Sequence, residues 1–174
     1  MNRYAITGIG LVIVAVAVFF ALTGQNDRNE SGANDLGRLS GFSLTDYEGR
    51  AVHLTDFAGK PLVVNTWAAW CPFCRQELPD FVALQKEFPD VAVIAIDRSE
   101  PLATAKGYTD ELGISGDILF LLDPGDDFYK NIGGFSMPET IFVDKSGTIV
   151  FHKRGIMTLA EMRAAVSQHL LPTP

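Results

Sequence analysis

Cysteine is scarce in this sequence: the chain of 174 residues has only two, Cys71 and Cys74, three positions apart. Two cysteines are too few for the set of disulfides that holds many small secreted domains together. A zinc site would need two further ligands, and His53, His152 and His169 are isolated from one another without ligand spacing. The cysteines are therefore interpreted as a local pair, and no metal is expected.

Positive charge and nucleotide-binding patterns are also lacking. The formal net charge is -7, and no run rich in Lys or Arg occurs, which argues against nucleic-acid binding. No G-x-G-x-x-G pattern follows a predicted strand, so neither flavin nor nicotinamide is expected and no cofactor is predicted. Apolar residues, in contrast, make up 47% of the chain and charged residues 20%, a balance that allows a buried core.

The N-terminus contains a long apolar run without charge, at residues 4–22. Its length is close to the roughly 20 residues that an apolar helix needs to cross a bilayer. The alternative is a cleaved signal peptide, whose apolar region usually has about 7 to 15 residues. The sequence therefore predicts a membrane anchor at residues 1–23, a flexible Gly/Asn/Asp/Ser-rich linker at 24–39 and one domain at 40–174, on the outer side of the cytoplasmic membrane.

Within the predicted domain, strand patterns and helix patterns alternate, which indicates an α/β fold. Alternating apolar residues around a turn with Gly49 predict an opening hairpin. Buried-type strands are predicted at 62–67, 91–96 and 118–122, an antiparallel strand pair at 139–144 and 148–153, and helices after the cysteines, before Gly113, at 126–132 and at 159–170.

The cysteine pair lies where the first buried strand gives way to a helix. A thiolate attacks disulfides, and the unpaired N–H groups and positive end of a helix N-terminus lower a thiol pKa, so Cys71 is the predicted nucleophile. Cys74 lies about one turn further, within the roughly 5 to 6 Å Cα separation of a disulfide, and is the predicted resolving thiol. Pro72 suits the first helical turn. The competing interpretations of this pair are a structural disulfide or half of a zinc site.

Residues 65–79, NTWAAWCPFCRQELP, resemble the active-site segment of the TlpA/ResA-like thioredoxin family. The similarity continues, in that family's order, through LTDFAGKP at 54–61, LDP at 122–124 and MPETIFVD at 137–144, and covers roughly residue 40 to the C-terminus. It implies a thioredoxin-like fold with a central mixed β-sheet flanked by helices, an N-terminal hairpin and an inserted αβ element.

The resemblance also implies a function and further site residues. It implies a membrane-tethered or secreted protein-disulfide reductase, and the Pro138-Glu139-Thr140 triplet is similar to the branch that serves cytochrome c maturation. The family's proline at Pro138 is cis and faces the cysteines, where the backbone of Met137 would pair with an extended substrate. Glu77 matches a family glutamate near the active site.

Other residues of the active-site segment complete the predicted site. Asn65 stands where cytosolic thioredoxins have a buried Asp, so Glu77 is the candidate to exchange protons with Cys74; the alternative is a solvated helix residue. Trp70, Pro72 and Phe73 are predicted to contact the substrate.

The sequence does not determine the direction of electron flow. In the leading interpretation, the dithiol reduces an extracytoplasmic protein such as an apocytochrome c, and a membrane thiol-disulfide protein donates the electrons. The alternatives are a dithiol oxidase that inserts disulfides and a non-catalytic binding module with an inert bridge. Reduction potential separates the two enzymes, because it spans about -270 to -120 mV among proteins with similar motifs.

Overall fold

The computed structural model describes residues 35, 41–42 and 44–171. The predicted anchor at residues 1–23, and all of the predicted linker at 24–39 except Asp35, lie outside the described residues. Within the described part of the chain, no helix combines the length and the apolar character needed to span a bilayer.

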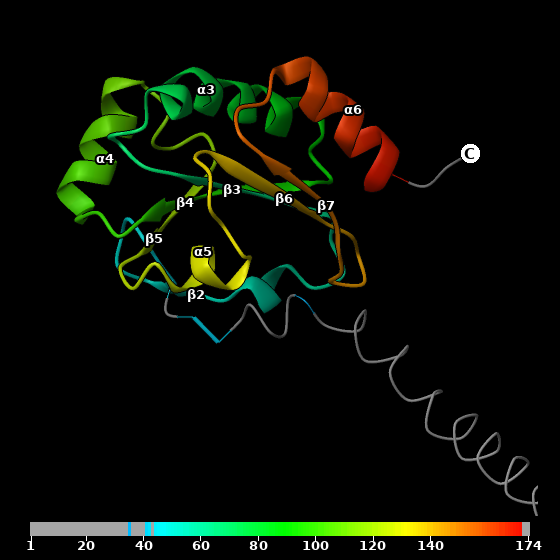
Figure 1. The fold of residues 1–174 in the computed structure, drawn as a ribbon, viewed down its shortest axis with the longest axis horizontal. Coiled ribbons are helices and arrows are strands. Elements are labelled where there is room, and N and C mark those ends of the chain that lie inside the picture. Colours follow the sequence, from blue (N-terminus) through cyan, green and yellow to red (C-terminus); the bar gives the residue numbers. More distant parts are fainter. Residues whose placement is uncertain (1–34, 36–40, 43, 172–174) are drawn as a thin grey trace, which may run out of the picture. The chain divides into compact units, whose positions relative to one another are not determined.

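A seven-stranded mixed sheet forms the centre of the domain (Figure 1). The strand order is β2-β1-β5-β4-β3-β6-β7. The β3–β4 and β4–β5 pairs are parallel, whereas the β1–β2, β1–β5, β3–β6 and β6–β7 pairs are antiparallel. The strands are β1 (Leu44–Asp46), β2 (Ala51–Val52), β3 (Leu62–Trp67), β4 (Ala92–Arg98), β5 (Leu119–Asp123), β6 (Glu139–Val143) and β7 (Ile149–Arg154).

Helices cover both faces of this sheet. On one face lie α3 (Pro72–Glu87), α4 (Leu102–Glu111) and α6 (Leu159–His169); on the other lie α5 (Asp127–Asn131) and the short 3-10 helix η1 (Leu54–Phe57), as Figure 1 shows. These elements agree with the sequence predictions, apart from shifts of one or two residues at most ends and the 3-10 helix η1, which the sequence did not predict. The expected mixed sheet, opening hairpin and thioredoxin-like arrangement are therefore confirmed.

Strand β3 leads into the active-site segment and lies in the interior of the sheet, between β4 and β6. All six of its residues are buried. Alternate side chains of a strand point to opposite faces, so Val63 and Trp67 join the core beneath α3, while Leu62 and Val64 join the core on the α5 side. Asn65 shares the α3 face with Val63 and Trp67, which puts a polar side chain under the helix that carries the cysteines.

Candidate active site

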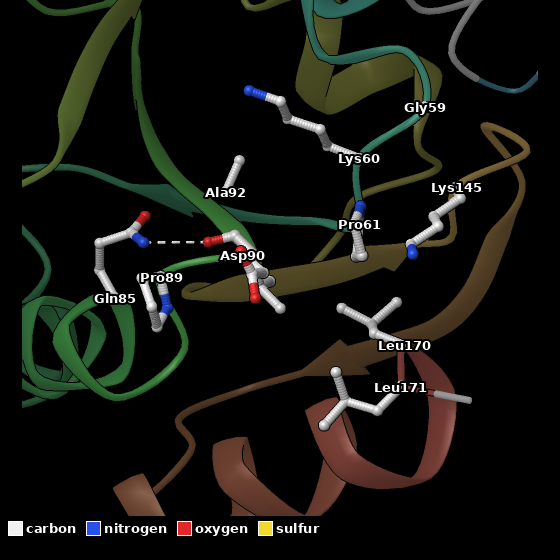
Figure 2. Close-up of a pocket in the computed structure, with 11 residues that line it drawn as sticks. Gly59, Lys60, Pro61, Gln85, Pro89, Asp90, Ala92, Lys145, Leu170 and Leu171 are labelled. Carbon is white, nitrogen blue, oxygen red and sulfur yellow. Dashed lines mark hydrogen bonds between the residues drawn. The ribbon is translucent and has the colours of Figure 1, made fainter. Parts of the chain in front are cut away.

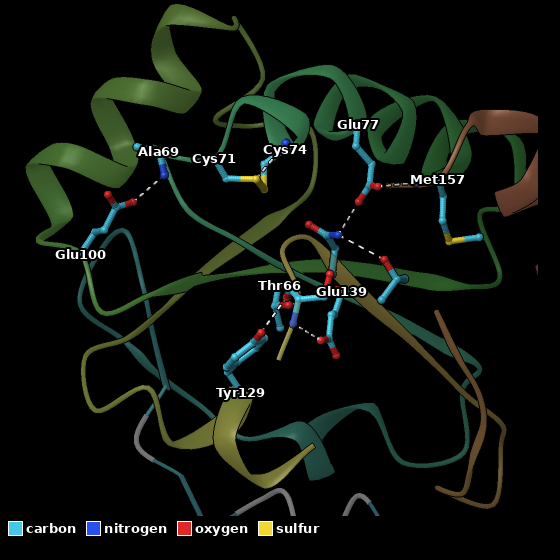
Figure 3. Close-up of a disulfide and its surroundings, with 12 residues drawn as sticks. Thr66, Ala69, Cys71, Cys74, Glu77, Glu100, Tyr129, Glu139 and Met157 are labelled. Atoms are coloured by element: carbon cyan, nitrogen blue, oxygen red, sulfur yellow. Dashed lines mark hydrogen bonds between the residues drawn. A yellow bond between two sulfur atoms is a disulfide. The ribbon is translucent and has the colours of Figure 1, made fainter. Parts of the chain in front are cut away.

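The two cysteines form a disulfide at the start of α3, just beyond the end of β3 (Figure 3). Cys71 is the N-cap residue of α3, and its Sγ accepts a hydrogen bond from the backbone N–H of Cys74 at 3.2 Å. Pro72 occupies the first turn, as predicted. The Cα atoms of the cysteines are 5.3 Å apart, within the predicted range. The segment thus brings the pair to a helix N-terminus.

The disulfide is almost enclosed, but its neighbours are open to solvent. Cys71 and Cys74 are 2% and 1% exposed, whereas Trp70 is 63% and Phe73 is 53% exposed. Large apolar side chains at such exposure lie in contact with water unless a partner covers them. The two aromatic residues therefore present apolar surface directly beside a nearly buried disulfide.

The Glu77 side chain projects from α3 into the interior and is only 1% exposed, so the alternative of a solvated helix residue is wrong. Its Oε1 accepts a hydrogen bond from Asn65 Nδ2 at 2.6 Å, and its Oε2 accepts one from the backbone N–H of Met157 at 2.6 Å. Burial raises the pKa of Glu77 from 4.5 to about 8, although these two hydrogen bonds lower it. The carboxyl group therefore titrates near neutral pH.

Asn65 connects the glutamate to the neighbouring strand. Its Nδ2 also donates to Thr140 Oγ1, at 3.2 Å, on β6. Asn65 and Thr140 are register partners in the β3–β6 pair. The amide therefore orients the Glu77 carboxyl from a fixed position in the sheet, where an aspartate would have added a second negative charge.

Met137 and Pro138 lie at the same end of the sheet as the cysteines. Strand β6 runs antiparallel to β3, so its first residue, Glu139, pairs with Thr66 near the end of β3. The Met137–Pro138 peptide bond is cis, as the resemblance implies. The Pro138 carbonyl accepts a hydrogen bond from Gly155 N–H at 2.8 Å, and Gly155 has φ +83°, a conformation that favours glycine.

Glu139 holds the loop before the proline from inside the protein. It is fully buried, and its Oε1 accepts the backbone N–H groups of Phe135 and Ser136 at 2.8 and 2.7 Å. Its Oε2 lies 2.6 Å from His152 Nε2 on β7. The Arg154 guanidinium lies 4.7 Å from the ring centre of Phe135. Glu139 thus fixes the conformation of the loop that leads to Met137.

The sequence analysis did not identify two acidic residues that lie near the loop before Cys71. Asp97, at the end of β4, is fully buried, and its Oδ1 accepts the Glu100 N–H at 3.0 Å. Glu100 Oε2 accepts the Ala69 N–H at 2.6 Å. An acidic residue directly after the apolar run 91–96 was the available signal, since the carboxyl ends of neighbouring parallel strands meet at one edge of a sheet.

A pocket lies at the opposite end of the sheet from the cysteines (Figure 2). It has a volume of about 590 Å³ and includes Pro61, which precedes β3, and Ala92, which begins β4, together with Lys60, Lys145, Leu170 and Leu171. Neither cysteine lines it. In the described part of the chain, no group of three or more His, Cys, Asp or Glu side chains is arranged to hold a metal ion.

Comparisons with known proteins agree with this geometry. A sequence model of the family described as redoxin matches residues 35–166. Thiol-disulfide oxidoreductase ResA of Bacillus cereus is 27% identical over 164 residues, which cover 92% of this chain and 93% of that protein. Thiol:disulfide interchange protein DsbE of Pseudomonas aeruginosa is 31% identical over 169 residues, covering 94% and 91%. The solved structure of MTB DsbF, in mixed oxidized and reduced forms, has a TM-score of 0.69 at 25% identity, covering 75% of this chain and 96% of that one.

Proposed function

The chain belongs to the redoxin family as a thiol-disulfide oxidoreductase of the ResA and DsbE kind, and from this premise we propose that it reduces protein disulfides on the outer side of a cytoplasmic membrane. In the proposed reaction, Cys71 is the nucleophile, Cys74 is the resolving thiol and Glu77 is the proton acceptor. The scheme uses no cofactor, because both electrons come from the two thiols.

The observation that carries the proposal is the position of Cys71 at the N-cap of α3. Its Sγ already accepts the N–H of Cys74 in the disulfide. After reduction, the same N–H and the positive end of the helix dipole face the sulfur and favour its thiolate form. This placement supports Cys71, rather than Cys74, as the attacking residue.

The first step forms a mixed disulfide. The Cys71 thiolate attacks one sulfur of a substrate disulfide, and the substrate S–S bond breaks as the new S–S bond forms. The substrate sulfur that leaves does so as a thiolate and takes a proton from water. Cys71 is then linked covalently to the other substrate sulfur.

The second step releases the substrate. Glu77 lies one helical turn beyond Cys74, and in its ionised form it takes the proton of the Cys74 thiol. The Cys74 thiolate attacks Cys71 Sγ, which expels the second substrate thiolate and forms the Cys71–Cys74 disulfide. Two electrons have then moved to the substrate. A carboxyl group with a pKa of about 8 exchanges protons readily near neutral pH.

The proposed substrate-binding surface surrounds the disulfide. Trp70, Pro72 and Phe73 supply apolar contact from the start of α3, and the exposure of the two aromatic rings supports this role. Met137 and Pro138 supply backbone for an extended substrate segment to pair with, at the edge where β6 begins.

The cell-envelope setting is the remaining part of the proposal. Residues 1–23 would anchor the chain in the membrane, and residues 24–39 would tether the domain at 40–174. A membrane thiol-disulfide protein would return electrons to the pair. The resemblance and the Pro138-Glu139-Thr140 triplet support a substrate in cytochrome c maturation, the disulfide between the haem-binding cysteines of an apocytochrome.

The reduction potential of the full chain tests the direction of electron flow. The chain, held in detergent, is equilibrated against glutathione and dithiothreitol buffers, and the Cys71–Cys74 disulfide is quantified by thiol labelling. A value well below about -200 mV supports the reductase, whereas a value near about -120 mV identifies an oxidase. A bridge that does not exchange under native conditions identifies a binding module.

A further inference from the structure

A carboxylate accepts a hydrogen bond from the loop that leads to Cys71. Residues 68–70 connect β3 to the N-cap of α3, and Glu100 Oε2 accepts the Ala69 N–H from this loop at 2.6 Å. Figure 3 shows the Glu100 carboxyl pointing at Ala69, on the side of the loop away from Cys74. A hydrogen bond from a backbone N–H to a charged acceptor is stronger than one between neutral groups. Glu100 therefore fixes the backbone two residues before the nucleophile.

Asp97 supports Glu100 from the interior. It is the register partner of Trp67 in the β3–β4 pair, so its side chain enters the protein beside the end of β3. Its Oδ1 accepts the Glu100 N–H at 3.0 Å, and among the described residues nothing donates a hydrogen bond to its Oδ2. Burial, and then the nearby Glu100 carboxyl, raise the pKa of Asp97 to about 8.

The backbone between these two acids adopts an unfavourable conformation. Ser99 has φ +57°, in the left-handed region that residues with a Cβ seldom occupy. Its N–H donates to the Asp123 carbonyl at 3.1 Å, which holds the turn in place. Such backbone conformations persist where the surrounding structure fixes them, and they often occur near functional sites. This turn brings the Glu100 side chain to Ala69.

The charged groups around Asp97 do not neutralise it. Asp123 on β5, like Glu100, disfavours a negative charge there. The Arg98 guanidinium, next in the chain, bonds instead to Asp126, with Nε–Oδ1 and Nη2–Oδ2 distances of 2.8 and 2.6 Å. Two adjacent carboxyl groups in such surroundings cannot both ionise freely, since like charges repel strongly at low dielectric.

We propose that Asp97 and Glu100 are a positioning pair for the nucleophile: the buried Asp97 carboxyl accepts the Glu100 N–H, and the Glu100 carboxylate accepts the Ala69 N–H and so places a negative charge at the loop that leads to Cys71. This inference rests on the proposed role of Cys71. The negative charge disfavours the Cys71 thiolate and so opposes the effect of the helix N-terminus. Because a destabilised thiolate destabilises the reduced protein, the pair makes the dithiol a better electron donor.

The test is the pH dependence of Cys71 alkylation by iodoacetamide in the reduced full chain. Glu100→Gln keeps an oxygen that accepts from Ala69 but removes the charge. We expect it to lower the pKa of Cys71 by about half a unit to one unit, since a nearby like charge is lost. Asp90→Asn is the matched control, because this exposed acid precedes β4 at its opposite end, and it should leave the Cys71 pKa unchanged.

Variants of Asp97 separate positioning from simple packing. Asp97→Leu removes the group that holds Glu100, and we expect it to shift the Cys71 pKa and to slow the single-turnover reduction of a disulfide peptide. Asp97→Asn should keep both values close to wild type, because its amide oxygen can still accept the Glu100 N–H. If Asp97→Leu fails to fold, the Glu100→Gln result still decides the proposal.

Three outcomes are distinguished by these measurements. A Cys71 pKa that is the same in Glu100→Gln as in Asp90→Asn and wild type overturns the positioning pair while leaving the proposed function intact. A Cys71 pKa that rises in Glu100→Gln overturns the assigned electrostatic role. Alkylation that occurs at Cys74 instead of Cys71 in every variant overturns the proposed nucleophile, and this inference with it.

Discussion

The side-chain amide of Asn65 donates a hydrogen bond to the buried carboxyl of Glu77 across 2.6 Å. This contact connects β3 to the helix that carries Cys74, and it keeps the carboxyl group aligned within the core. A buried acid is stabilised in its ionised form by such donors, but here burial has the larger effect and the pKa is raised. The resulting group is available both as an acid and as a base near neutral pH.

Replacing this acid should slow the second half of the reaction. We expect Glu77→Gln to reduce the rate of mixed-disulfide resolution by about a hundredfold, because a positioned proton acceptor contributes about 10²- to 10⁴-fold. The inflection near pH 8 should also disappear from the rate profile. Rapid-quench measurement of the mixed disulfide provides the rate. Glu87→Gln, an exposed position on the same helix, is the control; equal rates and equal thiol pKa values in both variants would refute the role.

The stability of the domain should depend on pH through the same residue. The folded-state pKa of Glu77 is about 8 and its usual value is 4.5, so between these pH values the folded protein keeps a proton that the unfolded chain releases. Stability is therefore expected to fall as pH rises from about 4.5 to about 8 and to level off above this range. Urea midpoints at several pH values measure this slope. It should become shallower in Glu77→Gln; an unchanged slope would contradict the assignment.

Single cysteine replacements should separate the two thiols. We expect Cys74→Ser to accumulate a stable mixed disulfide between Cys71 and a substrate peptide, because no resolving thiol is present. Cys71→Ser should form no such adduct at a comparable rate. Intact-mass spectrometry under non-reducing conditions detects the adduct, and the double replacement is the blank. If the adduct formed equally well on Cys74, the proposal that Cys71 is the nucleophile would be refuted.

The exposed aromatic rings should contribute to substrate binding rather than to the redox equilibrium. We expect Trp70→Ala to raise KM for a disulfide-containing protein substrate about tenfold, in the range for loss of a large interfacial side chain. The reduction potential should change little. Leu102→Ala is the control, because Leu102 is a 41% exposed apolar residue at the start of α4. A KM that changes equally in both variants would argue against a specific surface at Trp70.

Local signals in the sequence were sufficient to predict most of the strands and helices, and the family resemblance supplied their thioredoxin-like arrangement. The apolar run at 62–67 and the helical spacing after Cys74 each depend on neighbouring residues, and the motif identified the pair and its helix N-terminus. The state of Glu77 could not be derived in this way. Its burial depends on Met157, 80 positions later, whose N–H bonds to the carboxyl only after the chain has completed the sheet.

The Asp97 and Glu100 arrangement was missed for a related reason. Asp97 lies near the end of β4 and Glu100 lies just after it, in a polar stretch of sequence that is typical of an ordinary turn. Their significance comes from the parallel pairing of β3 with β4, which places Asp97 next to Trp67 and Glu100 next to Ala69. Periodicity identifies strands but does not state which ones become neighbours, so this contact requires the tertiary structure.

The bond from Met157 to Glu77 also limits how the chain could be re-engineered. Connections between a strand and a helix are usual sites for insertions or for new termini in a circular permutant. Here the segment between β7 and α6 supplies a backbone donor to the acid beneath the resolving cysteine. A new sequence inserted at this point would admit water to Glu77, so the connection between β7 and α6 is a poor place to attach a reporter domain, although it lies far from the cysteines in sequence.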